Sequence, residues 1–388
     1  TNGEIAQAAL LPDGKILVGV SSIKSGPMKD EILGIVDPVS GNVTALPSKP
    51  RSPFLDYMNA VSASEDGKTA YYGTWVRQDL GEVFSVPLPK GGTPTLVSPE
   101  RLAAIVSSIP VTADAEITVE CNPDDVTVEM LSTYRSGGVN RVSVGVQSMS
   151  SHVLAALGRT HDRDNVQRTV DAIRASGLPS FNLDIIYGAA GETVDDWATT
   201  LDEVIAFDPP HVSAYGLTVE AGTPLAGQPD RHPDDDDQAD KYELADDRLT
   251  AAGLGNYEVS NWARPGHESQ HNTLYWRQHN YRGFGCAAHS HADGRRWWNV
   301  RTPERYVDLI ATGGQIEAAA EVLDDETRRT ERLQLLLRTR DGVPAAAFTR
   351  DTRELLGELI VAHPDDAERV VLTRRGRLMA NEISMRLT

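Results

Sequence analysis

The stretch EITVECNPDDVTVEMLSTYRSGGVNRVSVGVQS, residues Glu116–Ser148, decides the fold class. It predicts a strand over Glu116–Pro123, a helix that ends at Gly137-Gly138, and a second strand over Arg141–Ser148. Two neighbouring strands that are joined through a helix form a right-handed crossover, and the strands are then parallel. The stretch therefore predicts a βαβ unit.

The same alternation continues downstream of this unit. A helix that ends at Gly177 precedes the strand FNLDIIYG (181–188), and a helix capped by Thr193 precedes the strand HVSAYGLTVE (211–220). Strands that alternate regularly with helices predict an α/β protein with a parallel sheet, either open or rolled into a barrel.

The first 88 residues have a different texture and repeat themselves. LPDGKILVGVSS returns as SEDGKTAYYGTW, and EILGIVDPVSGNVTALP returns as GEVFSVPLPKGGTPTLV. Short runs broken by turn dipeptides and repeated at an offset of roughly fifty residues are typical of propeller blades. Two such units cannot close a propeller, which needs about four or more blades. Residues 1–88 are therefore predicted to be a β-rich, propeller-like fragment with open sheet edges.

The composition excludes several classes of protein. A net charge of −19 argues against a broad nucleic-acid surface, because phosphate binding needs clustered Lys and Arg. No run approaches the roughly 18 apolar residues of a membrane span, and the first residues lack a signal pattern. Two cysteines, Cys121 and Cys286, form no disulfide framework. We expect a cytoplasmic chain of two or three domains.

Polar residues stand at the carboxyl ends of three successive predicted strands. They are Glu120, Gln147 and Asp184. Ligands bind at this edge of parallel sheets, so these residues are candidates for a binding site. Each of them alone could instead satisfy a local turn or loop amide, but their occurrence on successive strands favours a site.

Nine short motifs run in order from about residue 91 to the C-terminus: GGTPTL, EITVECNP, NRVSVGVQS, LGRTH, LDIIYG, YGLTVEAGTPL, YEVSNWARPG, HNTLYW and GFGCAAHS. In this order they resemble the radical S-adenosylmethionine family of oxygen-independent coproporphyrinogen III oxidase-like proteins, and within it the haem chaperone branch. The resemblance implies a partial (β/α)6 barrel over residues 89–322. It also implies a small helical C-terminal domain with a winged-helix look over residues 323–388.

The resemblance further implies S-adenosylmethionine as a cofactor. The residues that it assigns to this cofactor are Gly91, Gly92, Thr93, Glu120, Gln147, Arg159 and Asp184. Glycines allow backbone amides to approach a ligand without a clash at Cβ. Carboxylates can accept hydrogen bonds from ribose hydroxyls or from the ammonium group, and Arg159 can pair with the ligand carboxylate. A surface salt bridge is the alternative for Arg159.

Haem is the second ligand that the resemblance implies. The family's HNxxYW pattern, which is associated there with haem, is matched by His271, Asn272, Tyr275 and Trp276. Histidine can ligate iron, and aromatic side chains can line a flat apolar ligand. For the other histidines of the segment the ordinary explanation is a loop residue that is hydrogen-bonded locally. These are His279, His289 and His291.

One feature of the family is missing from this sequence. The family carries a CxxxCxxC motif for its four-iron cluster, and such a cluster with an open site needs three neighbouring thiolates. Cys121 and Cys286 lie far apart, and neither falls at a ligand position of the motif. We interpret each as a small buried hydrophobe. We therefore expect no metal ligands within this chain.

Three functions stay open at this point, and so does the question whether the chain is an enzyme. The first is haem binding and transfer to an acceptor haemoprotein, with peripheral contact to membrane haemoproteins as one possibility. The second is coproporphyrinogen III oxidation, the oxidative decarboxylation in porphyrin biosynthesis, against which HNTLYW and GRTH favour the chaperone branch. The third is a binding module centred on the propeller-like segment, against which the presence of only two blades argues.

Overall fold

The computed structural model describes residues 111–220 and 223–387, Val106 and Ile109, and the backbone of eight strands between Glu4 and Leu96. The chain divides into two compact units. The first comprises Thr1–Arg101, Gly283–His289 and Trp297–Ala320, and the second comprises Leu102–Arg282, Ser290–Arg296 and Glu321–Thr388.

The N-terminal strands form two four-stranded antiparallel sheets, ordered β1-β2-β3-β4 and β5-β6-β7-β8. Their bounds are β1 Glu4–Leu10, β2 Ile16–Ser21, β3 Ile32–Val36, β4 Val43–Leu46, β5 Tyr57–Ala63, β6 Thr69–Trp75, β7 Val83–Pro87 and β8 Thr95–Leu96. The repeated segments occupy corresponding strands, β2 with β6 and β3-β4 with β7-β8. This agrees with the β-rich character expected of residues 1–88.

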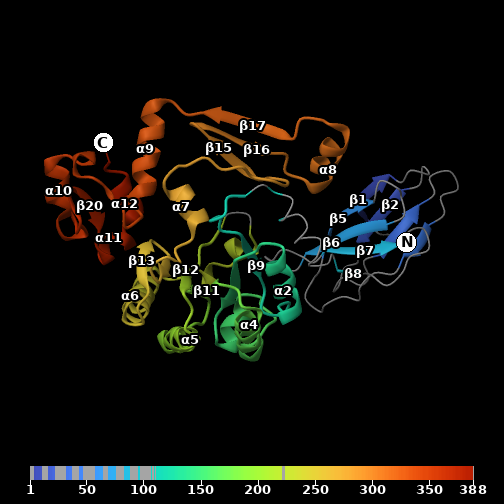
Figure 1. Ribbon diagram of the computed structural model, residues 1–388, viewed down its shortest axis with the longest axis horizontal. Coiled ribbons are helices and arrows are strands. Elements are labelled where there is room, and N and C mark those ends of the chain that lie inside the picture. Colours follow the sequence, from blue (N-terminus) through green and yellow to red (C-terminus); the bar gives the residue numbers. More distant parts are fainter. Residues whose placement is uncertain are drawn as a thin grey trace. The chain divides into compact units, whose positions relative to one another are not determined.

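A six-stranded mixed sheet forms the centre of the second unit, in the order β13-β14-β12-β11-β10-β9 (Figure 1). Its strands are β9 Thr118–Cys121, β10 Arg141–Gln147, β11 Ser180–Tyr187, β12 His211–Gly216, β13 Gly255–Glu258 and β14 Asn261–Ala263. The strands from β9 to β12 are parallel, as predicted. The antiparallel β13-β14 hairpin was not predicted, because strands this short show too little periodicity.

Four helices cover one face of this sheet (Figure 1). They are α2 Val128–Ser136, α4 Arg163–Ser176, α5 Val194–Ala206 and α6 Asp235–Ala251. The predicted helix signals are confirmed: the Thr193 hydroxyl accepts from the amide of Asp196, and Gly177 ends α4 with φ of 69°. A further helix that the sequence predicts from Ser98 lies outside the described residues apart from Val106 and Ile109.

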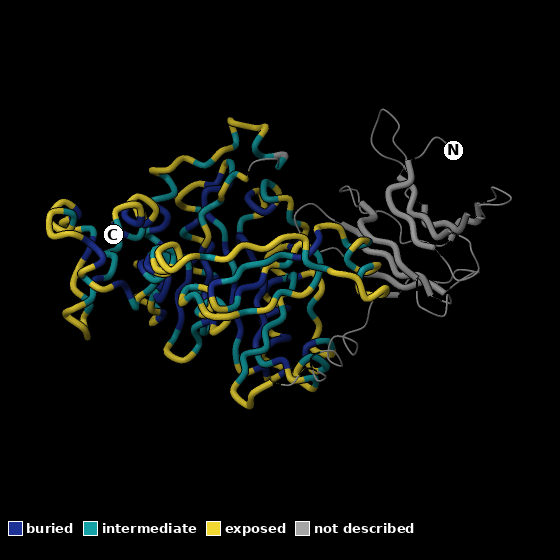
Figure 2. Tube along the Cα trace, turned by 90° about the horizontal axis from the view of Figure 1, so that it is seen from above, coloured by how far each residue is buried: buried dark blue, intermediate teal, exposed yellow. Residues whose placement is uncertain are grey.

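The core of the second unit lies between the sheet and these helices, where the buried residues gather (Figure 2). On β10, Val142, Val144 and Val146 are fully buried, and of the other residues of this strand all except Gly145 are buried as well. A central parallel strand is covered on both faces, so it lacks the apolar–polar alternation of a half-exposed strand. Trp197 and Leu201 of α5 are fully buried in the same cluster.

The remaining elements follow the sheet in sequence. They are α3 Ser151–Ala156, η1 Pro224–Gly227, η2 Pro229–Arg231, α7 Gln270–Trp276, β15 His289–Ala292, β16 Arg295–Asn299, α8 Pro303–Thr312, β17 Glu317–Val322, α9 Asp325–Leu336, β18 Val343–Pro344, η3 Ala345–Ala347, α10 Arg350–Leu356, η4 Gly357–Leu359, β19 Ile360–His363, β20 Asp366–Leu372, α11 Arg374–Leu378 and α12 Ala380–Ser384. The last strands form an antiparallel sheet ordered β18-β20-β19, which lies among short helices at the C-terminal end of the chain.

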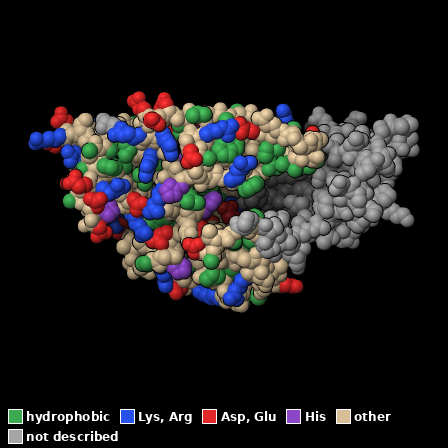
Figure 3. Space-filling model, turned by 45° about the horizontal axis from the view of Figure 1, so that its top comes forward, with side chains coloured by type: hydrophobic (Ala, Val, Ile, Leu, Met, Phe, Trp, Pro, Cys, Tyr) green, Lys and Arg blue, Asp and Glu red, His purple; other side chains and the backbone are tan. Residues whose placement is uncertain are grey.

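The described surface carries charges of both signs. Figure 3 shows Lys and Arg interspersed with Asp and Glu over the face in view, with histidine side chains among them. Among the helices of the described part of the chain, none combines the length and the apolar composition of a membrane span.

Candidate functional site

The predicted polar residues of the parallel strands lie at one edge of the sheet. Ser143 of β10 pairs with Glu120 of β9, and Gly145 of β10 pairs with Asp184 of β11. Because side chains alternate along a strand, Glu120, Ser143 and Asp184 share one face. The structure therefore brings Glu120 and Asp184 to one face of the sheet, with Glu120 next to the last residue of β9 and Asp184 three residues before the end of β11.

Gln147 ends β10 in a conformation that non-glycine residues seldom adopt. Its φ is 62°, and its side chain is buried. A Cβ at Gly145 would lie 2.7 Å from the Nε2 atom of Gln147 and 3.9 Å from Oδ1 of Asn122. The amide of Gln147 thus folds over the bare backbone of Gly145. A glycine inside a strand can mark such a close approach, and this signal was present in the sequence.

Arg159 lies in a loop that is tied to the ends of two strands. The Nε2 atom of buried His161 is 2.8 Å from the carbonyl oxygen of Val146, and the hydroxyl of Thr160 donates to Asp124 at 2.7 Å. These bonds fix the LGRTH loop beside the carboxyl ends of β9 and β10. Sequence reasoning missed the role of His161, although the motif contains it.

Asp184 is held by its neighbours on the sheet. The Ser143 hydroxyl donates to one carboxylate oxygen at 2.7 Å, and the Asn182 amide donates to the other at 2.8 Å. Burial raises the pKa of Asp184, while the hydrogen bonds from Ser143, Ser213 and Asn182 oppose this shift. The carboxylate is therefore oriented by the sheet itself.

His211, at the start of β12, is buried behind Asn182. Its Nδ1 atom lies 2.6 Å from Oδ1 of Asn182, and its Nε2 atom lies 2.9 Å from the hydroxyl of Tyr257. Burial, with Arg141 and His267 nearby, holds the pKa of His211 well below its ordinary value. The imidazole is neutral in the folded protein at neutral pH.

We expect the free energy of unfolding to fall as the pH drops below about 6.5. Below this pH the imidazole of His211 is protonated in the unfolded chain but stays neutral in the folded protein. This difference lowers the free energy of unfolding by up to about 1.4 kcal/mol per pH unit. Denaturant titrations at pH 7.5 and pH 5.5 measure this dependence in the wild type and in His211→Gln. In His211→Gln the free energy of unfolding should depend less steeply on pH, by the contribution of one bound proton. Identical pH dependences in the two proteins would contradict a neutral, buried His211.

The HNTLYW segment forms the short helix α7. Ser269 caps it, and the carboxylate of Glu116 accepts from the backbone amides of Gln270 and His271 at 3.1 and 3.3 Å. The Tyr275 hydroxyl lies 2.7 Å from Nε2 of exposed His271, and the two rings meet edge to face at 4.7 Å. The structure thus brings His271 and Tyr275 together.

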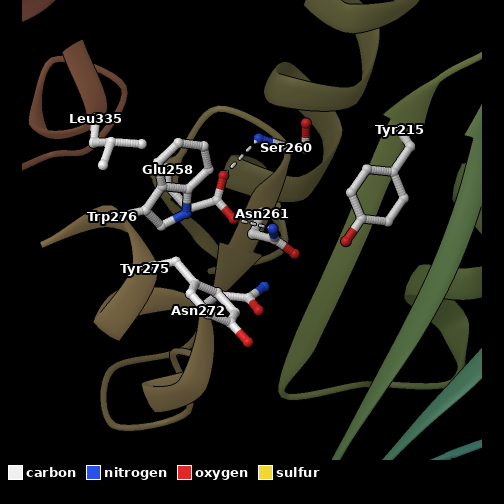
Figure 4. Close-up of a pocket in the computed structure, with 8 residues that line it drawn as sticks. All are labelled: Tyr215, Glu258, Ser260, Asn261, Asn272, Tyr275, Trp276 and Leu335. Carbon is white, nitrogen blue, oxygen red and sulfur yellow. Dashed lines mark hydrogen bonds between the residues drawn. The ribbon is translucent and has the colours of Figure 1, made fainter. Parts of the chain in front are cut away.

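A pocket of about 380 Å³ lies beside α7 (Figure 4). Its lining residues are Tyr215, Glu258, Ser260, Asn261, Asn272, Tyr275, Trp276 and Leu335. Burial raises the pKa of Glu258, and hydrogen bonds from the Ser260 amide, Asn261 and Trp276 oppose the shift. Three of the four matched HNxxYW residues therefore line the pocket, whereas His271 lies outside its lining. Glu258 and Asn261 were missed although both stand in the YEVSNWARPG motif, because that motif was used only for the resemblance and no role was assigned to its residues.

The other histidines of this segment have local partners. Nδ1 of buried His291 lies 3.1 Å from the carbonyl oxygen of His279, and its Nε2 accepts from the amide of Gly294 at 3.3 Å. His289 stacks on Trp298 with ring centroids 5.6 Å apart. The expectation of loop positions was wrong for His289 and His291, because both lie in strand β15.

Gly91, Gly92 and Thr93, which the resemblance assigns to the cofactor site, lie outside the described residues. For a cluster, the donor set does not fit: burial, then Asp125 and Glu120, raise the pKa of Cys121 to about 12, which disfavours a thiolate. Within the described ranges, no three His, Cys, Asp or Glu side chains gather as a metal site.

This chain is similar in sequence and in fold to known proteins. The Radical SAM superfamily profile matches residues 69–204. The heme chaperone HemW of Mycobacterium tuberculosis is 40% identical over 76% of this chain and 78% of its own length, and that of Bacillus subtilis is 32% identical over 85% and 90%. The solved structure of Escherichia coli coproporphyrinogen III oxidase, HemN, a radical SAM enzyme, is similar in fold at 22% identity. Its TM-score is 0.60 over 74% of this chain and 72% of that one.

Proposed function

The chain belongs to the heme chaperone HemW family of the radical SAM superfamily, and from this premise we propose that it binds haem at α7 and passes it to an acceptor haemoprotein. The observation that carries the proposal is the pairing of His271 with Tyr275 beside the aromatic pocket. The imidazole is exposed, and its partner lines the cavity.

The geometry of α7 suits an iron ligand. A ligating histidine usually gives its second ring nitrogen to a hydrogen-bond partner, which fixes the tautomer and the ring. Here Tyr275 occupies Nε2 of His271, and no described residue bonds Nδ1. Nδ1 is therefore the atom that would meet iron, while Tyr275 and Trp276 offer aromatic surface for the ring of the ligand.

The edge with Glu120, Gln147, Arg159 and Asp184 would hold S-adenosylmethionine. Support comes from the close packing of the Gln147 amide over Gly145 and from the orientation of the Asp184 carboxylate by Ser143 and Asn182. When bound to a cluster, this cofactor supplies radical chemistry in the superfamily. Because the cysteines of this chain do not fit a cluster, the proposed function includes no radical step.

Haem titration followed by the Soret band tests the proposed function. His271→Ala should weaken haem binding by at least about tenfold, because it removes the ligating nitrogen, whereas His279→Ala, His289→Ala and His291→Ala should stay within about twofold. Tyr275→Phe should give an intermediate loss, since it removes only the partner of the imidazole. Equal small losses in all four histidine variants would indicate surface adsorption and would exclude this site.

Calorimetry with S-adenosylmethionine tests the cofactor site. We expect weak binding, because no cluster chelates the amino and carboxylate groups, and a further loss of about tenfold in Glu120→Ala and in Asp184→Ala. Glu129→Ala, which removes an exposed carboxylate from α2, serves as the control. Tight binding that neither substitution changes would remove both carboxylates from the site.

A further inference from the structure

A continuous series of hydrogen bonds joins the start of α7 to Asp184. The Ser269 amide donates to the Tyr257 hydroxyl at 3.2 Å, and this hydroxyl lies 2.9 Å from Nε2 of His211. Nδ1 of His211 lies 2.6 Å from Oδ1 of Asn182, whose amide donates to Asp184 at 2.8 Å. The four residues before Asp184 are all buried, so water does not compete for these bonds.

The chemistry of the groups gives this series one direction. The Ser269 amide can only donate, so the hydroxyl hydrogen of Tyr257 is left for Nε2 of His211. The proton of the neutral imidazole must then be on Nδ1, where it meets the carbonyl oxygen of Asn182. The NH2 group of Asn182 is thereby turned toward Asp184. Each donor in the series thus fixes the orientation of the next group.

The far end of the series sets the same direction independently. An ionised carboxylate only accepts hydrogen bonds, so Asp184 requires the NH2 side of Asn182 to face it. If Asp184 loses its charge, or turns its oxygens to a ligand, the amide of Asn182 can reverse, provided that the Ser143 and Ser213 hydroxyls, which now accept from it, turn to donate. The proton of the imidazole then moves to Nε2, and the Tyr257 oxygen accepts from it as well as from the Ser269 amide. The series therefore has two ordered arrangements, and the state of Asp184 biases the choice between them.

We propose that Tyr257, His211 and Asn182 couple the two ends of this series, so that the charge and ligand state of Asp184 changes the affinity of α7 for haem. They act as positioning residues and touch neither ligand. The coupling is reciprocal, so haem on α7 changes the affinity at Asp184 by the same factor. This inference rests on the proposed function for the haem site at α7.

A double-mutant cycle on haem affinity tests the coupling. Asp184→Asn keeps the shape of the side chain and removes its charge, and Tyr257→Phe interrupts the series. We expect Asp184→Asn to change the haem Kd by about threefold or more in the wild type and by less than about 1.5-fold in Tyr257→Phe. Equal changes in both backgrounds would overturn the proposal.

Two matched substitutions serve as controls. Asp196→Asn changes another hydrogen-bonded carboxylate, which accepts from Thr193 and Ser150. Tyr242→Phe removes another tyrosine hydroxyl on a buried residue, one that donates to Val259. A cycle in which Asp196→Asn replaces Asp184→Asn should show additive effects on the haem Kd. A cycle in which Tyr242→Phe replaces Tyr257→Phe should be additive as well. Non-additivity of the same size in a control cycle would also overturn the proposal.

Nitrogen NMR of His211 gives a readout that needs no haem. The wild type should show a neutral imidazole with its proton on Nδ1, and Asp184→Asn should shift the two ring-nitrogen signals toward the other tautomer. Unchanged signals would overturn the coupling. If the wild type fails to bind haem, the proposed function fails and this measurement alone decides the coupling. Additive haem affinities with normal binding would instead remove the coupling and leave the function in place.

Discussion

Replacing Lys241 by Met should lower the free energy of unfolding by about 3–5 kcal/mol. The side chains of Lys241 and Glu192 have no exposed surface, and the Nζ atom lies 3.2 Å from the Glu192 carboxylate and 2.7 Å from that of Asp237. Lys241→Met leaves the Glu192 charge buried without its cation. Glu192 also accepts from the amide of Gly188, so the loop that follows β11 and Asp184 should loosen with it.

Denaturant titration measures this loss, and two variants calibrate it. Lys241→Met combined with Glu192→Leu removes both charges and should recover most of the stability, because the penalty comes from the unpaired charge. Arg248, like Lys241, lies on α6, and Arg248→Met breaks its more exposed pair with Asp202 of α5, which should cost about 1 kcal/mol or less. A loss in Lys241→Met as small as that in Arg248→Met would show that the buried pair contributes little.

Replacing Asp246 by Ala should cost a similar amount and should release the C-terminal segment. Asp246 of α6 is buried, accepts from the Trp262 indole at 2.9 Å, and accepts from Arg374 and Arg377 of α11 at 2.7 Å each. Burial acts to raise the pKa of Asp246, but Arg377, Trp262 and Arg374 together hold it below its ordinary value. Loss of the carboxylate leaves Arg377, itself largely buried, without this partner.

The measurement combines denaturant titration with limited proteolysis. We expect a loss of about 3–5 kcal/mol and faster cleavage within residues 323–388 in Asp246→Ala. Asp247→Ala is the matched control, because Asp247 is exposed and pairs with Arg374 at 2.6 Å. It should cost about 1 kcal/mol or less. Equal cleavage of the two variants would show that Asp246 does not hold the C-terminal segment in place.

Local signals predicted most of the central fold. The strands at Arg141–Gln147 and Ser180–Tyr187, the cap at Thr193 and the stop at Gly177 each depend on neighbours a few positions away. Such signals can be recognised in the sequence without knowledge of the tertiary structure, because they reflect backbone conformation and periodic burial. The β13-β14 hairpin was not predicted, because strands of four and three residues show too little periodicity.

Part of the candidate site was also predicted from the sequence, and part was shown only by the tertiary structure. The sequence alone predicted that Glu120, Gln147 and Asp184 stand toward the carboxyl ends of neighbouring strands, and parallel strands direct these ends to the same side of the sheet. It also supplied the HNxxYW pattern around His271. Only the tertiary structure showed that Gly145 makes room for Gln147.

The tertiary structure alone also decided which buried polar groups meet. Asn182, His211 and Tyr257 come from three different strands, and Lys241 reaches Glu192 from a helix some fifty positions away. No spacing rule connects such residues, because their contacts arise when the strands and helices pack and each buried donor must find an acceptor. The sequence determined which groups are available at the sheet edge, and packing determined which of them are bonded to one another.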